Sequence, residues 1–386
     1  MWIDATTVSH YNPANLVMSA RPRILILTAA FGDGHNSAAR NLALALALEV
    51  AGADTRVVDP CLLGAPRLTR ILGHAYRLVT THLPRVWLWI YRSAERCDFG
   101  DDDTPLFLRG PEHATRAAVE EFRPQVVVST YPLYPYFLAK MAKEKPEFPP
   151  VFVVITDSIE INASWLGASA TSWLVTDSTT RDVLIAKGLP AERVHETGFA
   201  VHPDFASLYP VPADDACDPF RVLYFPTSDI GGMRSRARVM LDASPVVRLT
   251  IVMGRNVRRL HAAACELKRA YPGRVRLIGW TRRVPQLLNR HHVVVGKAGG
   301  ATVHEAIAAR CPMLIHHLVP GQEEGNLRLL ELIGGGALAS KPEDLQHRVV
   351  ALLAQDAAAW RKMKNALAKH GKNSGAIAGA KLILEA

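Results

Sequence analysis

Short apolar runs alternate with amphipathic helical segments along almost the whole chain, and this alternation constrains the fold more than any other feature. The runs are uninterrupted and rich in β-branched residues: ILILT (24–28), TRVVD (55–59), QVVVST (125–130), VFVVIT (151–156), SWLVT (172–176), RVLYFP (221–226), VRLTIVMG (247–254), RVRLIGW (274–280), HVVVG (292–296) and PMLIHHL (312–318). Strands that are buried on both faces of a parallel sheet have this continuous apolar character, and crossover helices connect them. The sequence therefore predicts an α/β protein built from doubly wound parallel sheets.

A proline-rich and acidic segment without periodicity, FASLYPVPADDACDPF at residues 205–220, separates these runs into two sets. It predicts an interdomain linker between a first domain over residues 1–204 and a second over residues 221–372. We expect the last helical segment, residues 373–386, to cross back to the first domain. Doubly wound sheets bind ligands outside the carboxyl ends of their strands, so two facing sheets would share one ligand cleft.

The amino-acid composition indicates in which cellular compartment we expect the protein and what kind of partner it binds. The five cysteines are Cys61, Cys97, Cys217, Cys265 and Cys311. They are scattered along the chain and show neither the spacing of a disulfide framework nor that of a Cys/His metal site, which is typical of a protein in a reducing compartment. No stretch resembles a secretory signal or a transmembrane segment, so we expect a cytoplasmic protein. The formal charge of +9 favours an acidic partner, namely nucleic acid, nucleotide phosphates or an anionic membrane surface.

The stretch VVVGKAGGATVHEAIAARCPMLI, residues 293–315, begins as a buried strand, breaks at Gly299 and Gly300, and continues as a helix. Such a turn lets backbone N–H groups and the positive end of the helix dipole approach a ligand, and phosphate is the expected occupant. Glu305, one turn into the helix, can accept hydrogen bonds from both hydroxyls of a ribose. The pattern indicates a nucleotide site, although a tight turn beside a solvated glutamate fits it as well.

The segment PGQEEGN, residues 320–326, follows the next strand and reaches the same sheet edge. Its Gln322, Glu323 and Asn326 cluster at a helix start, where amide and carboxylate groups suit a polyhydroxyl ligand. The alternative is ordinary helix chemistry, in which the acids only offset the helix dipole.

The first domain opens with a strand, a loop containing GDGH, and a helix that the pattern predicts from Ser37 to Val50. Gly32, Gly34 and His35 therefore cap this helix and face the cleft. GDGH lacks the third glycine and the later acid of a dinucleotide site, which disfavours NAD binding. A histidine here can be a general base, or it can simply hydrogen-bond its own turn.

Six motifs together resemble glycosyltransferase family 28, whose enzymes have the GT-B fold. They are GDGH (32–35), STYP (129–132), ITD (155–157), TGFAVHPDF (197–205), GKAGGATVHEA (296–306) and PGQEEGN (320–326). The likeness runs from about Arg23 to about His370, and the processive diacylglycerol β-glucosyltransferases and monogalactosyldiacylglycerol synthases are the most similar members. It implies two Rossmann-like domains that face each other across a cleft.

The resemblance also implies a role for each motif. The second domain would bind a UDP-sugar as a substrate, without a metal or another cofactor. Gly299, Gly300, Ala301 and Thr302 would hold the pyrophosphate, Glu305 the ribose, Gln322, Glu323 and Asn326 the sugar or nucleotide, and the loop with Gly279 and Thr281 the uracil. His35 would be the base or orient the acceptor, and Asp157 of the TD motif is the other catalytic candidate.

Two departures from the family pattern concern the donor and the acceptor. The family's glycine-rich phosphate loop is replaced by FPTSDIGGM, residues 225–233, in which Ser228 is the candidate donor contact. The family's histidine after the TD motif is replaced in DSIEINASW by Asn162.

Residues 67–96 combine six arginines with tyrosines and tryptophans, which suits a segment at the interface of an anionic membrane. In the family this region contacts the acceptor and the membrane, and the candidates are Gly34, Arg85, Trp87, Trp89, Tyr91 and Arg92. A basic helical hairpin packed on its own core is the alternative, and nucleic-acid binding is disfavoured because no binding motif is present. The run Asp101–Asp103 is expected to be a solvated loop rather than a metal site.

These observations predict an inverting glycosyltransferase that moves a hexose from a UDP-sugar to a membrane lipid hydroxyl, that of diacylglycerol, at the inner face of the plasma membrane. The alternatives are a soluble or polyprenyl-linked acceptor, a UDP-sugar epimerase, and a nucleotide-binding protein without catalysis.

Overall fold

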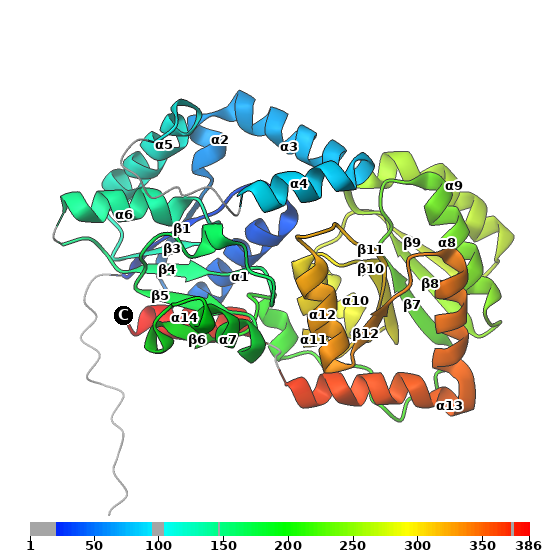
Figure 1. The fold of residues 1–386 in the computed structure, drawn as a ribbon. Helices are drawn as coiled ribbons and strands as arrows, with labels where there is room; N and C mark the ends of the chain where they lie inside the picture. Colours follow the sequence, from blue (N-terminus) through cyan, green and yellow to red (C-terminus); the bar gives the residue numbers. More distant parts are fainter. Residues whose placement is uncertain (1–20, 95–103, 146, 372–373) are drawn as a thin grey trace, which may run out of the picture.

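The computed structural model of the protein describes residues 21–94, 104–145, 147–371 and 374–386. Two six-stranded parallel sheets lie side by side, each covered by helices on both faces (Figure 1). The predicted α/β class with two doubly wound sheets is confirmed.

The first sheet has the strand order β2-β1-β3-β4-β5-β6. Its strands are β1 (Arg23–Leu27), β2 (Asp54–Val58), β3 (Val126–Ser129), β4 (Val151–Val154), β5 (Ser172–Val175) and β6 (Val194–Glu196). The helices of this half are α1 (Asp33–Glu49), α2 (Pro60–Gly64), α3 (Pro66–His82), α4 (Pro84–Ala94), α5 (Leu106–Phe122), α6 (Tyr134–Glu144) and α7 (Ser178–Ala186). Every residue of β3, β4 and β5 is buried, which explains why these strands are apolar except for Ser129 and Ser172.

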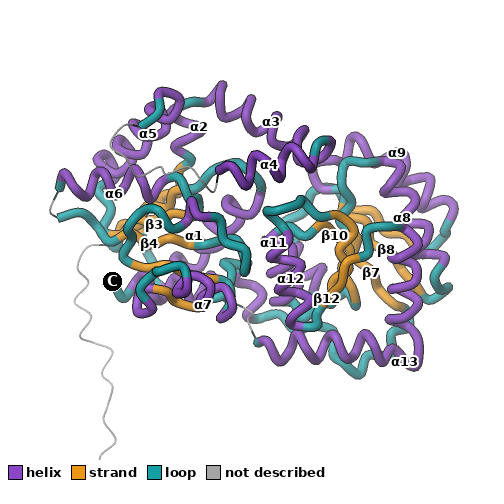
Figure 2. The backbone as a smooth tube through the Cα atoms, viewed as in Figure 1, coloured by secondary structure: helices purple, strands orange, loops and turns teal. Residues whose placement is uncertain are grey.

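The second sheet has the order β12-β11-β10-β7-β8-β9. Its strands are β7 (Phe220–Tyr224), β8 (Val247–Val252), β9 (Val275–Ile278), β10 (Val293–Lys297), β11 (Met313–His317) and β12 (Gly336–Leu338). Its helices are α8 (Ile230–Asp242), α9 (Val257–Ala270), α10 (Val284–Leu288), α11 (Gly300–Ala308), α12 (Glu324–Ile333) and α13 (Pro342–His370). Figure 2 shows these helices on both faces of the second sheet.

Each sheet contains one place where the strand order reverses, and ligands bind beside such a reversal. It lies between β1 and β3 in the first sheet and between β10 and β7 in the second. The loops that leave these strands contain GDGH and STYP in the first sheet, and KAGG and FPTSD in the second. The motifs singled out in the sequence therefore lie at both reversals.

Two strands and one helix boundary differ from the sequence prediction. The strands β6 and β12 were not predicted, because each has three residues and pairs with one neighbour at a sheet edge. Helix α1 begins at Asp33 rather than at Ser37. Gly32 can adopt the φ of 93° that the turn before the helix requires, and the negative charge of Asp33 is stabilised by the positive end of the helix dipole.

The carboxyl-terminal helices connect the two halves of the molecule. Helix α13 is interrupted by non-helical residues from Ala354 to Ala357, and α14 (Gly375–Leu384) packs against α1 of the first domain. Helix α14 also approaches the chain after β6, since a side chain at Gly375 would overlap the backbone of Gly198 and Phe199. One apolar cluster contains buried residues of both sheets, so the two halves share part of their core.

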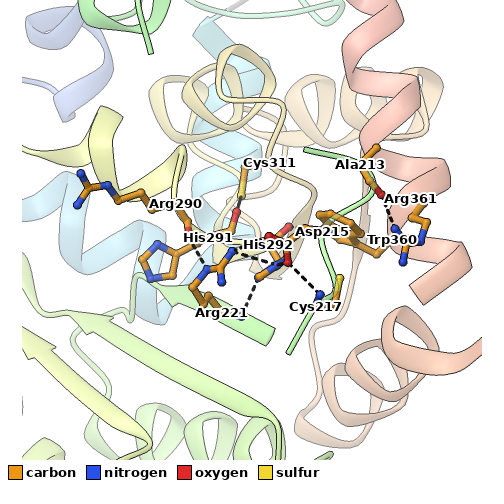
Figure 3. Close-up of polar contacts among 10 residues, drawn as sticks. All are labelled: Ala213, Asp215, Cys217, Arg221, Arg290, His291, His292, Cys311, Trp360 and Arg361. Carbon is orange, nitrogen blue, oxygen red and sulfur yellow. Dashed lines mark hydrogen bonds and ion pairs between the residues drawn. The ribbon is translucent and has the colours of Figure 1, made fainter. Parts of the chain in front are cut away.

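A network of polar contacts holds the segment before β7 against the second sheet (Figure 3). The carboxylate of Asp215 accepts hydrogen bonds from Nε2 of His292 at 2.8 Å and from the Cys217 N–H at 2.9 Å. The Nε1 of Trp360 donates to the carbonyl of His292 at 2.7 Å. Burial alone would raise the pKa of Asp215, but the bond from His292, the Cys217 N–H and the charge of Arg221 hold that pKa at about 2.

Candidate functional site

The carboxyl edges of the two sheets meet where α11 and α12 approach the loop after β4. A Cβ atom on Gly300 would lie 2.9 Å from the carbonyl oxygen of Thr156, and one on Gly325 would overlap the carbonyl oxygen of Ser158. The Ser158 hydroxyl also bonds Nε2 of His304 at 2.9 Å across this contact. Both helix starts therefore require glycine, since the opposite backbone fills the space that a side chain would need.

His35 lies in the first turn of α1. Its Nδ1 is 2.7 Å from the carbonyl oxygen of Thr130 and 3.0 Å from the hydroxyl of Thr156. Because a carbonyl only accepts, Nδ1 carries the proton and Nε2 presents a lone pair. Burial lowers the pKa of His35 to about 4, partly opposed by the Thr130 bond, so the ring is neutral at pH 7. The neighbouring Gly34 borders open space, since a Cβ there would meet no atom within 4 Å.

Asp157 follows β4 and accepts a hydrogen bond at 2.8 Å from Nε1 of Trp165. Burial raises the pKa of Asp157 to about 6, and the Trp165 bond only partly opposes this. The rings of His35 and Trp165 lie 6.0 Å apart, so one tryptophan separates the two candidate bases. A pKa of about 6 makes Asp157 the stronger base and leaves it mostly ionised at pH 7.

Two helix N-termini at the edge of the second sheet differ in their capping. In the first turn of α8, the backbone N–H of Gly232 donates a hydrogen bond of 3.0 Å to the carboxylate of Asp229, so an acidic side chain already caps that helix N-terminus. Helix α11 is preceded by Gly299, which has no side chain to cap the N–H groups of Gly300, Ala301 and Thr302. Anions bind at uncapped helix N-termini, so α11 offers the better phosphate site.

Lys297 ends β10 and places a cation beside the same turn. Its Nζ is 2.9 Å from Oε1 of Glu323 and 3.5 Å from the position of a Cβ on Gly299. The side chain of Lys297 is 52% exposed, whereas that of Glu323 is 8% exposed. Burial alone would lower the pKa of Lys297, but the Glu323 carboxylate outweighs burial and raises that pKa. A permanent positive charge therefore stands at the candidate phosphate site.

Glu323 and Asn326 are partly engaged by the protein itself. Oε2 of Glu323 accepts from the N–H of Val319 at 3.1 Å, so both of its oxygens have partners. The amide of Asn326 donates to the carbonyl of Ala298 at 3.1 Å. Its Oδ1 is buried and, among the described residues, has no hydrogen-bond partner. Glu323 thus orients Lys297, while Asn326 offers an acceptor to a ligand.

Glu305 lies one turn along α11 from the glycine turn and is half-buried. Burial raises the pKa of Glu305 to about 7, and no described residue donates a hydrogen bond to its carboxylate. A carboxylate that the protein leaves unsatisfied at a predicted ribose position is consistent with a ligand-binding role.

The other predicted donor residues follow β7 and β9. The hydroxyl of Thr281 accepts from the Arg283 N–H at 3.0 Å within its own turn, and the Gly279 carbonyl accepts from Gly254 at 3.2 Å. Three strand spacings separate β9 from β10, so this loop lies about 14 Å from the glycine turn. Ser228 is nearer, because β7 is adjacent to β10. Within the described part of the chain, neither Thr281 nor Ser228 forms a hydrogen bond with Glu305.

The hairpin of α3 and α4 reaches from the first domain toward the second (Figure 1). The hydroxyl of Tyr76 donates to Oε1 of Gln322 at 2.8 Å, which joins the hairpin to the PGQEEGN loop. The ring of Trp87 packs edge-on against Tyr76 at 5.0 Å. Tyr91 approaches Gly321 so closely that a Cβ on this glycine would lie 3.0 Å from its ring. The hairpin therefore has an inner face that packs against the PGQEEGN loop of the second domain.

The outer face of the hairpin is apolar and exposed. The exposed fractions are 70% for Trp89, 65% for Ile71, 61% for Leu78, 54% for Leu83, 45% for Val86 and 40% for Ile90. Arg85 is exposed on the same hairpin, whereas the side chain of Arg92 is not described. Trp87 is half-buried and Trp89 is exposed, because residues two apart on a helix point to different faces, and contact of Trp87 with an acceptor or a membrane stays a prediction.

Sequence reasoning did not identify Lys297 and Tyr76 as site residues. Lys297 stands directly between the apolar strand and the glycine turn, and a charged residue at that position is the signal that points to it. Tyr76 contacts a residue 246 positions away in the chain, so no local pattern could find it.

One group of three potential metal ligands exists within the described residues, namely Asp215, Cys217 and His292, whose ligand atoms lie within 4.8 Å of one another. The Arg221 guanidinium is 3.3 Å from Asp215 and 3.2 Å from His292, and its charge opposes a second cation. This cluster therefore anchors the linker. The run Asp101–Asp103 lies outside the described residues. Within the described ranges, every helix is too short or too polar to cross a bilayer.

Comparisons with known proteins agree with this arrangement. The family model for monogalactosyldiacylglycerol (MGDG) synthase matches residues 35–201. A processive diacylglycerol beta-glucosyltransferase of Bacillus cereus (strain AH187) is 22% identical over 359 residues, covering 91% of this chain and 90% of the relative. The resemblance to glycosyltransferase family 28 is thus confirmed.

Solved structures confirm the GT-B fold. MurG of Acinetobacter baumannii matches with a TM-score of 0.61 at 15% identity, covering 95% of this chain and 100% of that chain. MnaA of S. aureus, in a structure with UDP, matches with a TM-score of 0.56 at 13% identity, covering 92% and 94%.

Proposed function

We propose that this protein is an inverting glycosyltransferase that moves a hexose from a UDP-sugar to the hydroxyl of a membrane lipid, diacylglycerol. One observation carries the proposal. The uncapped start of α11, with Lys297 beside it, packs against the loop that holds Thr156 and Asp157. A donor diphosphate bound at the start of α11 and an acceptor hydroxyl bound at this loop would lie side by side.

The chemistry follows from this arrangement. The acceptor oxygen attacks the anomeric carbon as the bond from that carbon to the UDP oxygen breaks, and the electron pair leaves with UDP. Asp157 takes the hydroxyl proton, because its pKa of about 6 suits a base better than that of His35 at about 4. The neutral His35 would accept a hydrogen bond at Nε2 and orient the acceptor.

The developing charge on UDP would be neutralised by the α11 N-terminus and Lys297, so we expect transfer without a metal ion. The carboxylate of Glu305 would accept hydrogen bonds from the ribose hydroxyls. The side-chain amides of Asn326 and Gln322 would accept hydrogen bonds from the hydroxyls of the sugar. The loop with Gly279 and Thr281 would contact uracil. Glu323 also positions Lys297, and the acceptor sites that remain on its two oxygens could accept from the sugar.

The outer face of the α3 and α4 hairpin supports a lipid acceptor. Exposed apolar side chains grouped on two adjacent helices suit an interaction site, and exposed arginines on the same helices suit anionic headgroups. Arg67, Arg70 and Arg85 are exposed on this hairpin. We propose peripheral association with the inner face of the plasma membrane, with Trp89 at headgroup depth.

Incubation with UDP-hexoses and vesicles containing diacylglycerol tests the proposal. Release of UDP together with a new glycolipid supports it. A new UDP-sugar formed without lipid would identify an epimerase, and binding without turnover would identify a nucleotide sensor. Turnover with soluble or polyprenyl-linked acceptors alone would replace the lipid assignment.

A further inference from the structure

One hydrogen bond connects the α3 and α4 hairpin of the first domain to the donor side of the second domain. The hydroxyl of Tyr76 in α3 donates to Oε1 of Gln322 at 2.8 Å, although 246 positions of the chain separate the two residues. Gln322 lies in the loop before α12, where its neighbour Glu323 pairs with Lys297. Tyr76 therefore contacts, from the opposite domain, a side chain that we assign to the transferred hexose.

The position of the Tyr76 ring is fixed by helix α4. The ring packs edge-on against Trp87 of this helix, with 5.0 Å between the ring centroids. Leu88 and Tyr91 of the same helix approach Gly321 so closely that a Cβ on this glycine would lie 3.0 Å from each of them. Helix α4 therefore contacts both Tyr76 and the residue directly before Gln322, and these contacts hold the two hydrogen-bonding partners together.

Tyr76 lies near both halves of the candidate reaction centre. Burial raises the pKa of its hydroxyl. The charge of Lys297 lowers this pKa, whereas the charges of Glu323 and Asp157 raise it further. The ring is thus close enough to the candidate phosphate site and to the candidate base for the charges of both to act on it. Because its pKa is raised, the hydroxyl stays protonated at pH 7 and remains a hydrogen-bond donor.

The bond from Tyr76 determines what Gln322 can offer to a sugar. A glutamine amide has two lone pairs on its oxygen and two N–H donors, and a free glutamine side chain samples many rotamers. Tyr76 uses one lone pair of Oε1, so the other lone pair and the two N–H groups point in fixed directions. Fixed donors and acceptors distinguish hydroxyls of different configuration, whereas a freely rotating amide adapts to either configuration.

From these contacts, and resting on the proposed function, we infer that Tyr76 is a positioning residue for the donor. It orients Gln322 toward the hexose and thereby sharpens the choice between sugars that differ at one hydroxyl. Tyr76 acts through Gln322 and does not need to touch the sugar. Binding of UDP alone would not depend on Tyr76, because Gln322 is assigned to the sugar.

Tyr76→Phe tests this inference, because the change removes only the hydroxyl and keeps the ring that packs against Trp87. Tyr209→Phe is the matched control, since Tyr209 is 92% exposed. Calorimetry measures the affinities for UDP, UDP-glucose and UDP-galactose. We expect Tyr76→Phe to bind UDP as the wild type does, to bind the preferred hexose donor roughly threefold to tenfold more weakly, and to lose most of the preference between the two hexoses.

Two results of the calorimetry would overturn the inference. Equal weakening of all three ligands would show that the hydroxyl only docks the hairpin on the second domain. A preference between the hexoses that is absent in the wild type, or unchanged in folded Tyr76→Phe, would show that Tyr76 does not select the sugar.

A double variant shows whether Tyr76 acts through Gln322. Gln322→Ala removes the amide, so the addition of Tyr76→Phe should cause no further loss of affinity for the UDP-hexose. Losses that multiply in the double variant would give Tyr76 a role independent of Gln322 and would contradict the inference.

These binding measurements need no lipid, so they separate the inference from the proposed function. If the choice of hexose depends on Tyr76 but vesicles containing diacylglycerol are not glycosylated, only the proposed function fails. If the lipid is glycosylated while folded Tyr76→Phe keeps the preference of the wild type, only the inference fails.

Discussion

Nδ1 of His35 lies 2.7 Å from the carbonyl oxygen of Thr130, and this bond joins the loops after β1 and β3 at the strand reversal of the first sheet. It fixes the proton on Nδ1 and directs the Nε2 lone pair away from the backbone. Together with burial it keeps the ring neutral over the physiological range, because the pKa of His35 is about 4. His35 is therefore oriented for accepting a hydrogen bond.

The pH dependence of turnover should distinguish His35 from Asp157 as the base. If Asp157 accepts the proton, kcat at saturating donor rises with pH and levels off above an apparent pKa of about 6, where Asp157 is ionised. We expect Asp157→Asn to lose about 10²–10⁴ in kcat and His35→Gln to lose less while keeping the same profile. A profile that levels off near pH 4 would instead assign the base to His35.

Removing the charge of Lys297 should weaken contact with the diphosphate and slow its departure. We expect Lys297→Met to bind UDP at least about tenfold more weakly, to bind uridine as the wild type does, and to lose roughly a hundredfold in kcat. Calorimetry with both ligands and steady-state rates measure this. The exposed Lys268→Met is the matched control, and equal losses for uridine and UDP would show a general disturbance of the site.

Glu305→Gln should reduce donor binding yet stabilise the free protein. Its pKa is raised from 4.5 to about 7, so the folded state holds the proton more tightly than the unfolded state, and stability falls as pH rises from about 4.5 through 7. Glu305→Gln has no carboxylate to ionise, so its stability should not fall in this pH range. We therefore expect the difference in Tm between the variant and the wild type to be larger at pH 8 than at pH 5, in favour of the variant.

Donor affinity should show the opposite trend at the same residue, because only the ionised carboxylate accepts from both ribose hydroxyls. UDP affinity of the wild type should rise with pH through about 7, while that of Glu305→Gln should be roughly tenfold to a hundredfold lower at pH 8. Calorimetry at several pH values checks this. The phosphate of UDP also titrates, but it does so equally for the wild type and for Glu305→Gln, so the variant serves as the control for that effect. Unchanged UDP affinity would remove Glu305 from the donor site.

The sequence was sufficient for features that depend on neighbouring residues. The central strands were predicted because burial on both faces demands a continuous apolar run, as in Val126–Ser129. The glycine turn at Gly299 and Gly300 was predicted because it interrupts such a run directly before a helix. The short edge strand β12 was not, since its three residues are only half-buried and show no pattern.

Features that depend on contacts between distant residues could not be predicted. The ion pair of Glu323 with Lys297 was not predicted, because it requires the loops after β10 and β11 to be adjacent. The pKa of Asp157 depends on burial beside Trp165, which composition does not reveal. The two faces of α4 were merged in the sequence interpretation, because alternating arginines and aromatics obscured the helical period.

Trp89 and Trp87 provide a matched pair for testing membrane association. Trp89 is 70% exposed, whereas Trp87 packs against Tyr76. Trp89→Ala should therefore lower vesicle binding with little change in Tm, and Trp87→Ala should lower Tm by removing a half-buried ring that packs against Tyr76. Added salt should weaken binding of the wild type to anionic vesicles, since each nearby arginine contributes about 1 kcal/mol that is screened over about 8 Å. The apolar contribution of Trp89 should persist at high salt, and UDP affinity should stay constant. Vesicle flotation at low and high salt with both variants checks this, and unaltered binding by Trp89→Ala would mean that the outer face of α4 does not contact the bilayer.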